Sequence, residues 1–154
     1  MPLPLIRNLK TVDPSDKSST KVVQIETAMG SAVNVFPGAR VIEVERKRFL
    51  PVKTTNDLML LRSDVYEITE QQHLIARKPA PLVQLDDHYK LIADFEARTP
   101  SGPPSLLGAD SLTVRGDWIF GADVVATGDA HLVAPGEGAH AVPDGAHIGP
   151  DGLA

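Results

Sequence analysis

The C-terminal third of the chain carries a repeat of six residues, which restricts the fold more than any other feature. In a triangular parallel β-helix, each group of six supplies one side: a large apolar residue fills the core, and a small residue two positions earlier allows the corner. Steps of six run through Leu106, Leu112, Trp118, Val124, Ala130, Gly136, Val142, Ile148 and Ala154, most of them apolar. The repeat predicts a short left-handed parallel β-helix over residues 101–154.

A glycine-rich antiparallel β domain or an unstructured tail is the alternative, because Pro135-Gly136-Glu137-Gly138 interrupts the rhythm. Fewer than three full coils fit into residues 106–154. A solenoid this short needs support from a neighbouring structure. We therefore expect its first coil to pack against the preceding part of the chain.

Residues 1–100 show a different pattern, in which strands and helices alternate. Turn-forming residues at 13–19 predict a loop, and apolar residues at helical spacing from Ile25 to Phe36 predict a helix that Pro37-Gly38 ends. The other expected elements are strands at 4–7, 40–44 and 82–85, a helix starting near Asn56, and a helix at 86–98 with Ile92 and Phe95 facing inward. This order predicts an α/β domain part over residues 1–100, followed by the β-helix domain over 101–154.

Composition narrows the classes of function. The sequence has no cysteine and no long apolar run, and it opens without a basic leader, so we expect a cytoplasmic protein that neither crosses a membrane nor holds a thiolate metal site. A net charge of −5 argues against nucleic acid as a partner. Basic residues outnumber acidic ones between residues 39 and 62, so an anionic ligand is expected there.

Lys53 is the best candidate for contacting that anion. Thr54 and Asp57 form a loose capping box, which predicts a helix that begins within a residue or two of Thr54. The N-terminus of a helix carries a partial positive charge and free N–H donors, and an adjacent ammonium group would reinforce it as a phosphate site. The alternative is a solvated lysine in front of an ordinary capped helix.

Five stretches of the sequence resemble the UTP–glucose-1-phosphate uridylyltransferases of eukaryotic type. The segment FLPVKTT at residues 49–55 is the most specific, within a match over 46–58. The other four similar stretches, in the same order as in the family, are residues 8–13, 23–32, 81–85 and 112–121. Glu45 and Lys47 depart from the family pattern, where proline and serine are usual, but they leave the centre of the match intact.

The resemblance implies that the chain is the C-terminal portion of an enzyme that converts UTP and glucose 1-phosphate to UDP-glucose and pyrophosphate. Lys53 stands at the family's active-site lysine, and Lys10 is a weaker substrate-binding candidate that could equally be structural. The family's N-terminal half, with its nucleotide-binding loop and its Mg²⁺-binding aspartate, has no counterpart here. The resemblance therefore implies Mg²⁺ for the complete enzyme, no metal ligand in this chain, and no activity of this portion alone.

Two other functions compete with this interpretation. The first is a non-catalytic assembly module that forms a homo-oligomer through the β-helix, since that domain takes part in subunit contacts in the family. The second is a hexapeptide-repeat acyltransferase, which would need several more coils and would leave the match at residues 8–58 unexplained.

Overall fold

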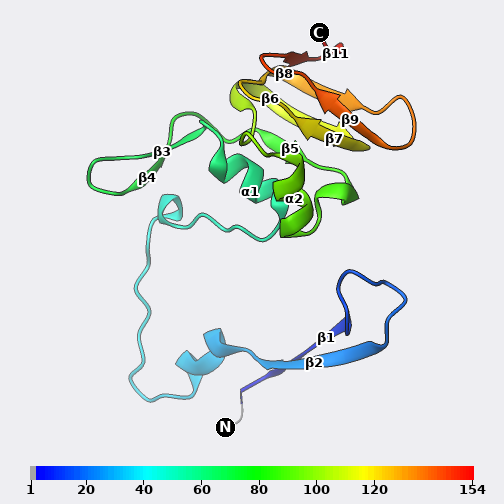
Figure 1. The fold of residues 1–154 in the computed structure, drawn as a ribbon. Helices are drawn as coiled ribbons and strands as arrows, with labels where there is room; N and C mark the ends of the chain where they lie inside the picture. The colour runs from blue at the N-terminus through cyan, green and yellow to red at the C-terminus, as the bar shows by residue number, and fades with distance from the viewer. Residues whose placement is uncertain (1–2) are drawn as a thin grey trace. The chain divides into compact units, whose positions relative to one another are not determined.

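The computed structural model describes residues 3–154, apart from the side chain of Lys47. The chain forms two compact units, residues 1–50 and 51–154, which are described separately. It is a mixed α/β protein in which strands predominate (Figure 1). Among the residues described, none lies in a helix that is both long and apolar enough to cross a membrane.

Unit 1 is built around an antiparallel ribbon of β1 (Leu5–Thr11) and β2 (Lys21–Thr27), in which Leu5 pairs with Thr27 and Leu9 with Val23. The predicted strand at 4–7 and loop at 13–19 are confirmed, and the side chains of Asp13 and Asp16 close the loop by accepting backbone hydrogen bonds. Two short 3₁₀ helices follow, η1 (Met29–Asn34) and η2 (Arg46–Arg48).

Two predictions for this unit are wrong. Ile25 lies in β2 rather than in a helix, and only the 3₁₀ turn at Met29–Asn34 follows it. The β-branched run of Val22, Val23 and Ile25 favours a strand, and pairing with β1 satisfies its backbone, so the helical spacing was coincidental. Residues 40–44 form no strand, and in the part of the chain described no other strand pairs with them.

Unit 2 begins with short helices and strands. They are α1 (Thr55–Arg62), the hairpin of β3 (Tyr66–Ile68) and β4 (Leu74–Ala76), β5 (Leu82–Gln84), the 3₁₀ turn η3 (Asp87–Tyr89) and α2 (Ile92–Arg98). The predicted helix near Asn56 and the strand at 82–85 are confirmed, the strand one residue shorter. The predicted helix at 86–98 divides into η3 and α2, with Phe95 buried but Ile92 exposed.

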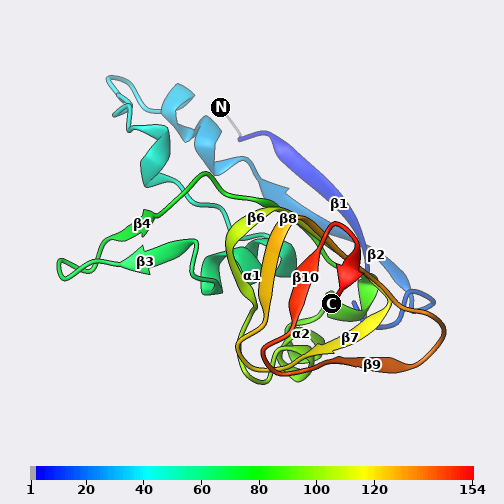
Figure 2. The ribbon, with the colours of Figure 1, turned by 90° about the horizontal axis from the view of Figure 1, so that it is seen from above.

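The rest of unit 2 consists of strands, most of which pair in parallel. These are β6 (Ser105–Arg115), β7 (Asp117–Phe120), β8 (Val125–Val133), β9 (Ala139–Val142), β10 (His147–Gly149) and β11 (Gly152–Leu153). One sheet has the order β11-β10-β8-β6-β5, parallel except for β11, and β7 pairs with β9 in a second parallel sheet. Figure 2 shows β6, β8 and β10 side by side, with β7 and β9 along another side.

The six-residue repeat coincides with the core of these sheets. Seven of its nine large positions are buried, namely Leu106, Leu112, Trp118, Val124, Ala130, Val142 and Ile148. Leu112 pairs with Ala130, three steps of six later, whereas Phe120 pairs with Val142. The longer spacing of the second pair spans the exposed loop at 135–138, which is the interruption seen in the sequence.

Side chains of η3 and α2 connect the helical part of unit 2 to these sheets. Arg98 donates two hydrogen bonds to the carboxylate of Asp117, at 2.7 and 2.9 Å, and the two side chains are only 17% and 18% exposed. The buried hydroxyl of Tyr89 donates to the carbonyl of Trp118 at 2.5 Å, and burial raises the pKa of this phenol. These bonds support the predicted packing of the first coil against the preceding chain.

The ion pair between Arg98 and Asp117 should make the free energy of unfolding decrease at acidic pH. Hydrogen bonding from Arg98 is the main cause that lowers the pKa of Asp117. The pKa of Asp117 in the folded protein therefore lies below its value of about 3.9 in the unfolded chain. The stabilisation by the ion pair is complete at pH values above the pKa of the unfolded chain. It is lost as the pH falls through the pKa of the folded protein.

We expect Asp117→Asn to lower the free energy of unfolding by about 2 kcal/mol at pH 7, since hydrogen bonds to charged groups contribute that much. The difference from wild type should narrow at pH 3, where the wild-type pair is also weakened. Urea unfolding at both pH values measures this, with Asp151→Asn at an exposed position as the control. An equal deficit of Asp117→Asn at both pH values would contradict the explanation.

Candidate functional site

Lys53 lies immediately before α1, and its backbone is fixed by a carboxylate. One oxygen of Asp57, Oδ2, accepts hydrogen bonds from the backbone N–H of Lys53, the backbone N–H of Thr54 and the hydroxyl of Thr54, each at 2.9 Å. Thr54 is the N-cap, and it forms the predicted capping box with Asp57. The sequence pattern therefore predicted the start of the helix to within one residue.

The first turn of α1 is anchored to the rest of unit 2. Thr55 and Met59 are buried, and the side-chain oxygen of Asn56 accepts a hydrogen bond of 3.0 Å from the backbone N–H of Leu85, just after β5. A residue that precedes such an anchored turn has a fixed backbone position. The Lys53 side chain itself is exposed, so its ammonium group can meet a ligand from solvent.

The Asp57 carboxylate places a negative charge at the start of this helix. The backbone hydrogen bond from Lys53 is the main cause that lowers the pKa of Asp57, so the carboxylate is ionised at neutral pH. That carboxylate already occupies the N–H groups of Lys53 and Thr54. The N–H groups of Lys53 and Thr54 are therefore not available to a phosphate, and Asp57 holds the backbone from which the Lys53 side chain projects.

Lys10 belongs to unit 1, whereas Lys53 belongs to unit 2. Lys10 is exposed on β1, opposite Val22 and on the same face of the ribbon as Ile6 and Asn8. In the basic stretch before Lys53, Arg46 donates a hydrogen bond to the carbonyl of Phe49, and its guanidinium lies 5.1 Å from the centre of that ring. Arg46 thus supports the chain that leads to residue 51.

The described residues include no group of three or more His, Asp or Glu side chains that could hold a metal ion. The residue that sequence reasoning left out of the site is Asp57. Its sequence signal is the Thr54-x-x-Asp57 spacing, which by itself indicates only the start of a helix.

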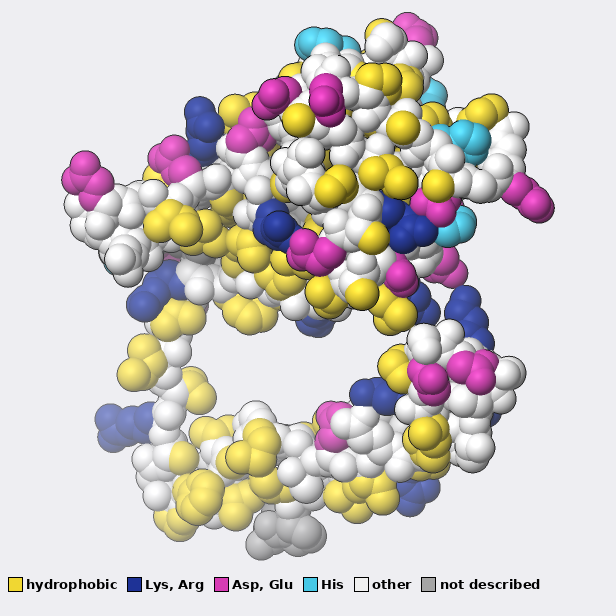
Figure 3. All heavy atoms as spheres, in the orientation of Figure 1, with side chains coloured by type: hydrophobic (Ala, Val, Ile, Leu, Met, Phe, Trp, Pro, Cys, Tyr) yellow, Lys and Arg dark blue, Asp and Glu magenta, His cyan; other side chains and the backbone are white. Residues whose placement is uncertain are grey.

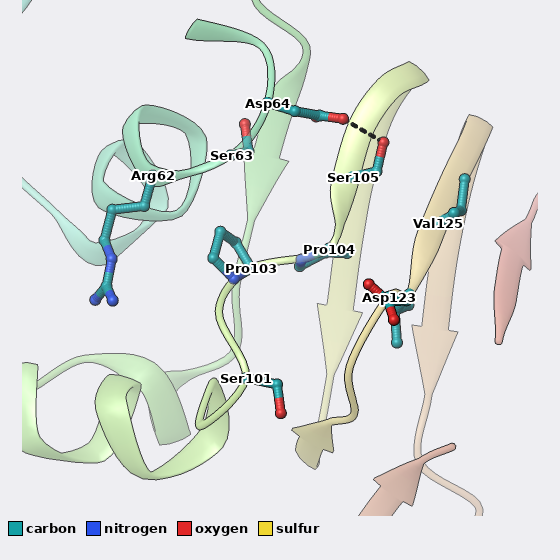
Figure 4. A pocket seen from close by; sticks show the side chains of 10 residues that line it. Arg62, Ser63, Asp64, Ser101, Pro103, Pro104, Ser105, Asp123 and Val125 are labelled. Carbon is teal, nitrogen blue, oxygen red and sulfur yellow. Dashed lines mark hydrogen bonds between the residues drawn. The ribbon is translucent and has the colours of Figure 1, made fainter. Parts of the chain in front are cut away.

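A cavity of about 330 Å³ lies beyond the opposite end of α1, between that helix and the strands β6 and β8 (Figure 4). Asp64 faces it, but its carboxylate already accepts from the Ser105 hydroxyl at 2.5 Å and from the Leu106 N–H at 2.8 Å. Arg62, at its edge, is paired with Glu96 at 2.5 Å. Neither Lys53 nor Lys10 lines this cavity, so it is separate from the predicted phosphate contact.

Comparison with known proteins gives a consistent result. The family model described as UTP–glucose-1-phosphate uridylyltransferase matches residues 1–126. The probable UTP–glucose-1-phosphate uridylyltransferase of Schizosaccharomyces pombe is 39% identical over 147 residues, which cover 92% of this chain and 28% of that protein. The enzyme of that name from Hordeum vulgare is 40% identical over 140 residues, covering 87% of this chain and 29% of that protein.

Solved structures agree. A protein described as UDP-glucose phosphorylase from Trypanosoma brucei has a TM-score of 0.86 and 42% identity, and the match covers 97% of this chain and 34% of that one. A mutant UDP-glucose pyrophosphorylase from Leishmania major, in complex with UDP-glucose, has a TM-score of 0.78 and 44% identity over 96% of this chain and 32% of that one.

The chain thus spans roughly 30% of the length of the curated relatives it matches. The family model covers most of this chain, including both Lys10 and Lys53. The chain therefore belongs to the UTP–glucose-1-phosphate uridylyltransferase family.

Proposed function

We propose that this chain is the C-terminal portion of an enzyme that transfers a uridylyl group from UTP to glucose 1-phosphate. Residues 1–100 would complete its catalytic domain, and residues 101–154 would form a short left-handed parallel β-helix. The parallel pairing of β6, β8 and β10 and the burial of the six-residue repeat support the second assignment. The names of the matched relatives support the assignment of the uridylyl transfer.

The observation that carries the proposal is the position of Lys53, held by Asp57 in front of an anchored helix. In the reaction, an oxygen of the glucose 1-phosphate group bonds to the α-phosphorus of UTP, and the bond from that phosphorus to the pyrophosphate oxygen breaks. Negative charge shifts among the phosphate oxygens as this happens, and an ammonium group that contacts them stabilises it. We assign this catalytic contact to Lys53, and a supporting contact with substrate phosphate to Lys10.

The proposal includes Mg²⁺ as the ion of the complete enzyme, with its ligands outside this chain, and UTP, glucose 1-phosphate and UDP-glucose as its small-molecule partners. It also includes a cytoplasmic location and a homo-oligomer formed through residues 101–154. The absence of cysteine supports the location.

The proposal is tested by measuring pyrophosphate release from UTP and glucose 1-phosphate. We expect turnover from the full-length gene product in the presence of Mg²⁺ and none from a polypeptide of these 154 residues alone, because Lys53 supplies only one contact of the site. Turnover by the 154-residue polypeptide that rises with its concentration and vanishes in Lys53→Ala would refute the second expectation. A full-length product that forms a defined oligomer without turnover would instead indicate an assembly module.

A further inference from the structure

The tripeptide Pro-Asp-Gly occurs twice near the end of the sequence, at residues 143–145 and 150–152. An aspartate followed by glycine is the pair at which a protein backbone rearranges most easily, because glycine has no Cβ to hinder the approach of its amide. Both aspartates have the same residue on either side, so their reactivity in an unfolded chain should be nearly equal. A difference between them in the folded protein is therefore caused by structure.

The first copy is held against residues 121–122. Oδ1 of Asp144 accepts a hydrogen bond of 2.7 Å from the backbone N–H of Ala122. The N–H of Gly145 donates to the carbonyl of Ala122 at 2.8 Å. Gly121 leaves the space for this contact, since a Cβ there would lie 2.5 Å from Oδ1 of Asp144. The two groups that would have to react with each other, the Asp144 carboxylate and the Gly145 nitrogen, are thus both bound to Ala122.

The second copy forms the turn between β10 and β11. These strands pair over only two residues each, Ile148 with Leu153 and Gly149 with Gly152. Asp151 is exposed, and its carboxylate has no hydrogen-bond or ion-pair partner among the residues that the structure describes. Figure 3 shows acidic side chains on the surface at this end of unit 2. A pairing this short at the edge of a sheet opens readily by local fraying, which frees the Gly152 nitrogen.

We propose that Asp151–Gly152 is a site of spontaneous isoaspartate formation, whereas Asp144–Gly145 is protected from it. The nitrogen of Gly152 bonds to Cγ of Asp151, the amide proton leaves with the carboxyl OH as water, and a five-membered succinimide ring forms. Water from the solvent then breaks the bond between that nitrogen and the α-carbonyl of Asp151. The main chain now runs through Cγ, and the α-carboxyl group is free. One water is lost and one is gained, so the mass of the protein is unchanged.

The rearrangement adds one methylene group to the main chain in the turn between β10 and β11. Because the length of a hairpin turn fixes the register of its strands, the pairing of Ile148 with Leu153 should be lost. The hydrogen bond of 2.9 Å from the N–H of Ala154 to the carbonyl of His147 should be lost with it. At present β11 covers the edge of β10. An uncovered edge strand is a template for pairing with another chain, so the modification would open this end of the sheet.

The test follows isoaspartate in the full-length gene product during incubation at pH 7. Chromatography separates isoaspartyl peptides from normal peptides of the same mass, and electron-transfer fragmentation assigns the position. We expect the isoaspartyl fraction to grow at least tenfold faster at Asp151 than at Asp144. In concentrated urea, where the structure is lost, the two rates should agree within twofold, because the local sequence is the same.

Asp151→Glu is the matched control. It keeps the charge, but its ring would have six members and forms far more slowly, so the product at position 151 should vanish while the rate at Asp144 stays within twofold. The amide of Ala154 should exchange with solvent at least threefold faster in isomerised wild-type protein than in fresh protein. Incubation of Asp151→Glu should leave this exchange rate unchanged.

Equal rates at Asp144 and Asp151 in the folded protein would overturn the proposal, since the contacts with Ala122 would then give no protection. A faster rate at Asp144 would overturn it too, as would isoaspartate that forms at Asp151 only in urea. Unchanged exchange of the Ala154 amide in isomerised protein would contradict the loss of β11.

Discussion

Lys53→Ala in the full-length gene product should lower kcat/KM for UDP-glucose formation by about 10²–10³-fold, the effect typical of removing one fixed group that stabilises transition-state charge. The protein should remain folded, because Asp57 binds the backbone N–H of residue 53 and not its side chain. Initial rates of pyrophosphate release measure the effect on activity. Thermal unfolding of the same samples checks that the fold is unchanged.

Lys90→Ala is the matched control, because Lys90 is another exposed lysine of unit 2, at the end of η3. It should leave kcat/KM within about twofold of wild type, since surface charges that lie away from a site interact with it only weakly through water. Lys53→Arg keeps the charge but changes its shape and position, and we expect it to recover part of the lost rate. A Lys53→Ala enzyme with near-normal kcat/KM would remove Lys53 from the site.

Local sequence signals predicted the parts of unit 2 that local interactions determine. The Thr54-x-x-Asp57 spacing located the start of α1, because both partners of the capping box lie within one turn. The six-residue repeat located part of the core of β6 to β10, although after the loop at 135–138 its steps fall on another position of the coil, since Val142 pairs with Phe120 and Ile148 with Ala126. Both signals concern contacts whose spacing along the chain is fixed by the geometry of the backbone.

The failures in unit 1 have a different origin. Ile25 and its neighbours satisfy a helical spacing and a strand composition equally well, and only pairing with β1 decides between them. Residues 40–44 have the composition of a strand, but a strand also requires a partner. In a unit whose described side chains include none that is buried, the hydrophobic pattern does not reveal which face meets a core.

The candidate site also depended on contacts that are distant in sequence. Asn56 accepts a hydrogen bond from the backbone of Leu85, and this bond has no signature in the local pattern. The sequence therefore identified Lys53 through family resemblance and a helix start. It could not show that Asp57 binds the N–H groups of Lys53 and Thr54 together, because that depends on a side-chain conformation.

Gly116 lies at a corner between β6 and β7 where a side chain cannot fit. Its φ of +89° is one that residues with a Cβ rarely adopt, and an added Cβ would lie 2.4 Å from the Cβ of Ala134. The backbone cannot readily shift, because the N–H of Gly116 donates to Asp86 at 2.9 Å and the N–H of Ala134 donates to the carbonyl of Arg115 at 3.0 Å. The corner is held from both sides.

Gly116→Ala should therefore lower the free energy of unfolding by about 2–5 kcal/mol, combining backbone strain of about 1–2 kcal/mol with overpacking of about 1–3 kcal/mol. Urea unfolding measures it. Adding Ala134→Gly should recover the overpacking part, because it removes the atom that clashes, and a double-mutant cycle separates the two contributions. Gly136→Ala, in open space and without a positive φ, should cost less than about 0.5 kcal/mol. Equal decreases in the free energy of unfolding for Gly116→Ala and Gly136→Ala would mean that the close approach of Gly116 to Ala134 does not exclude a side chain at this corner.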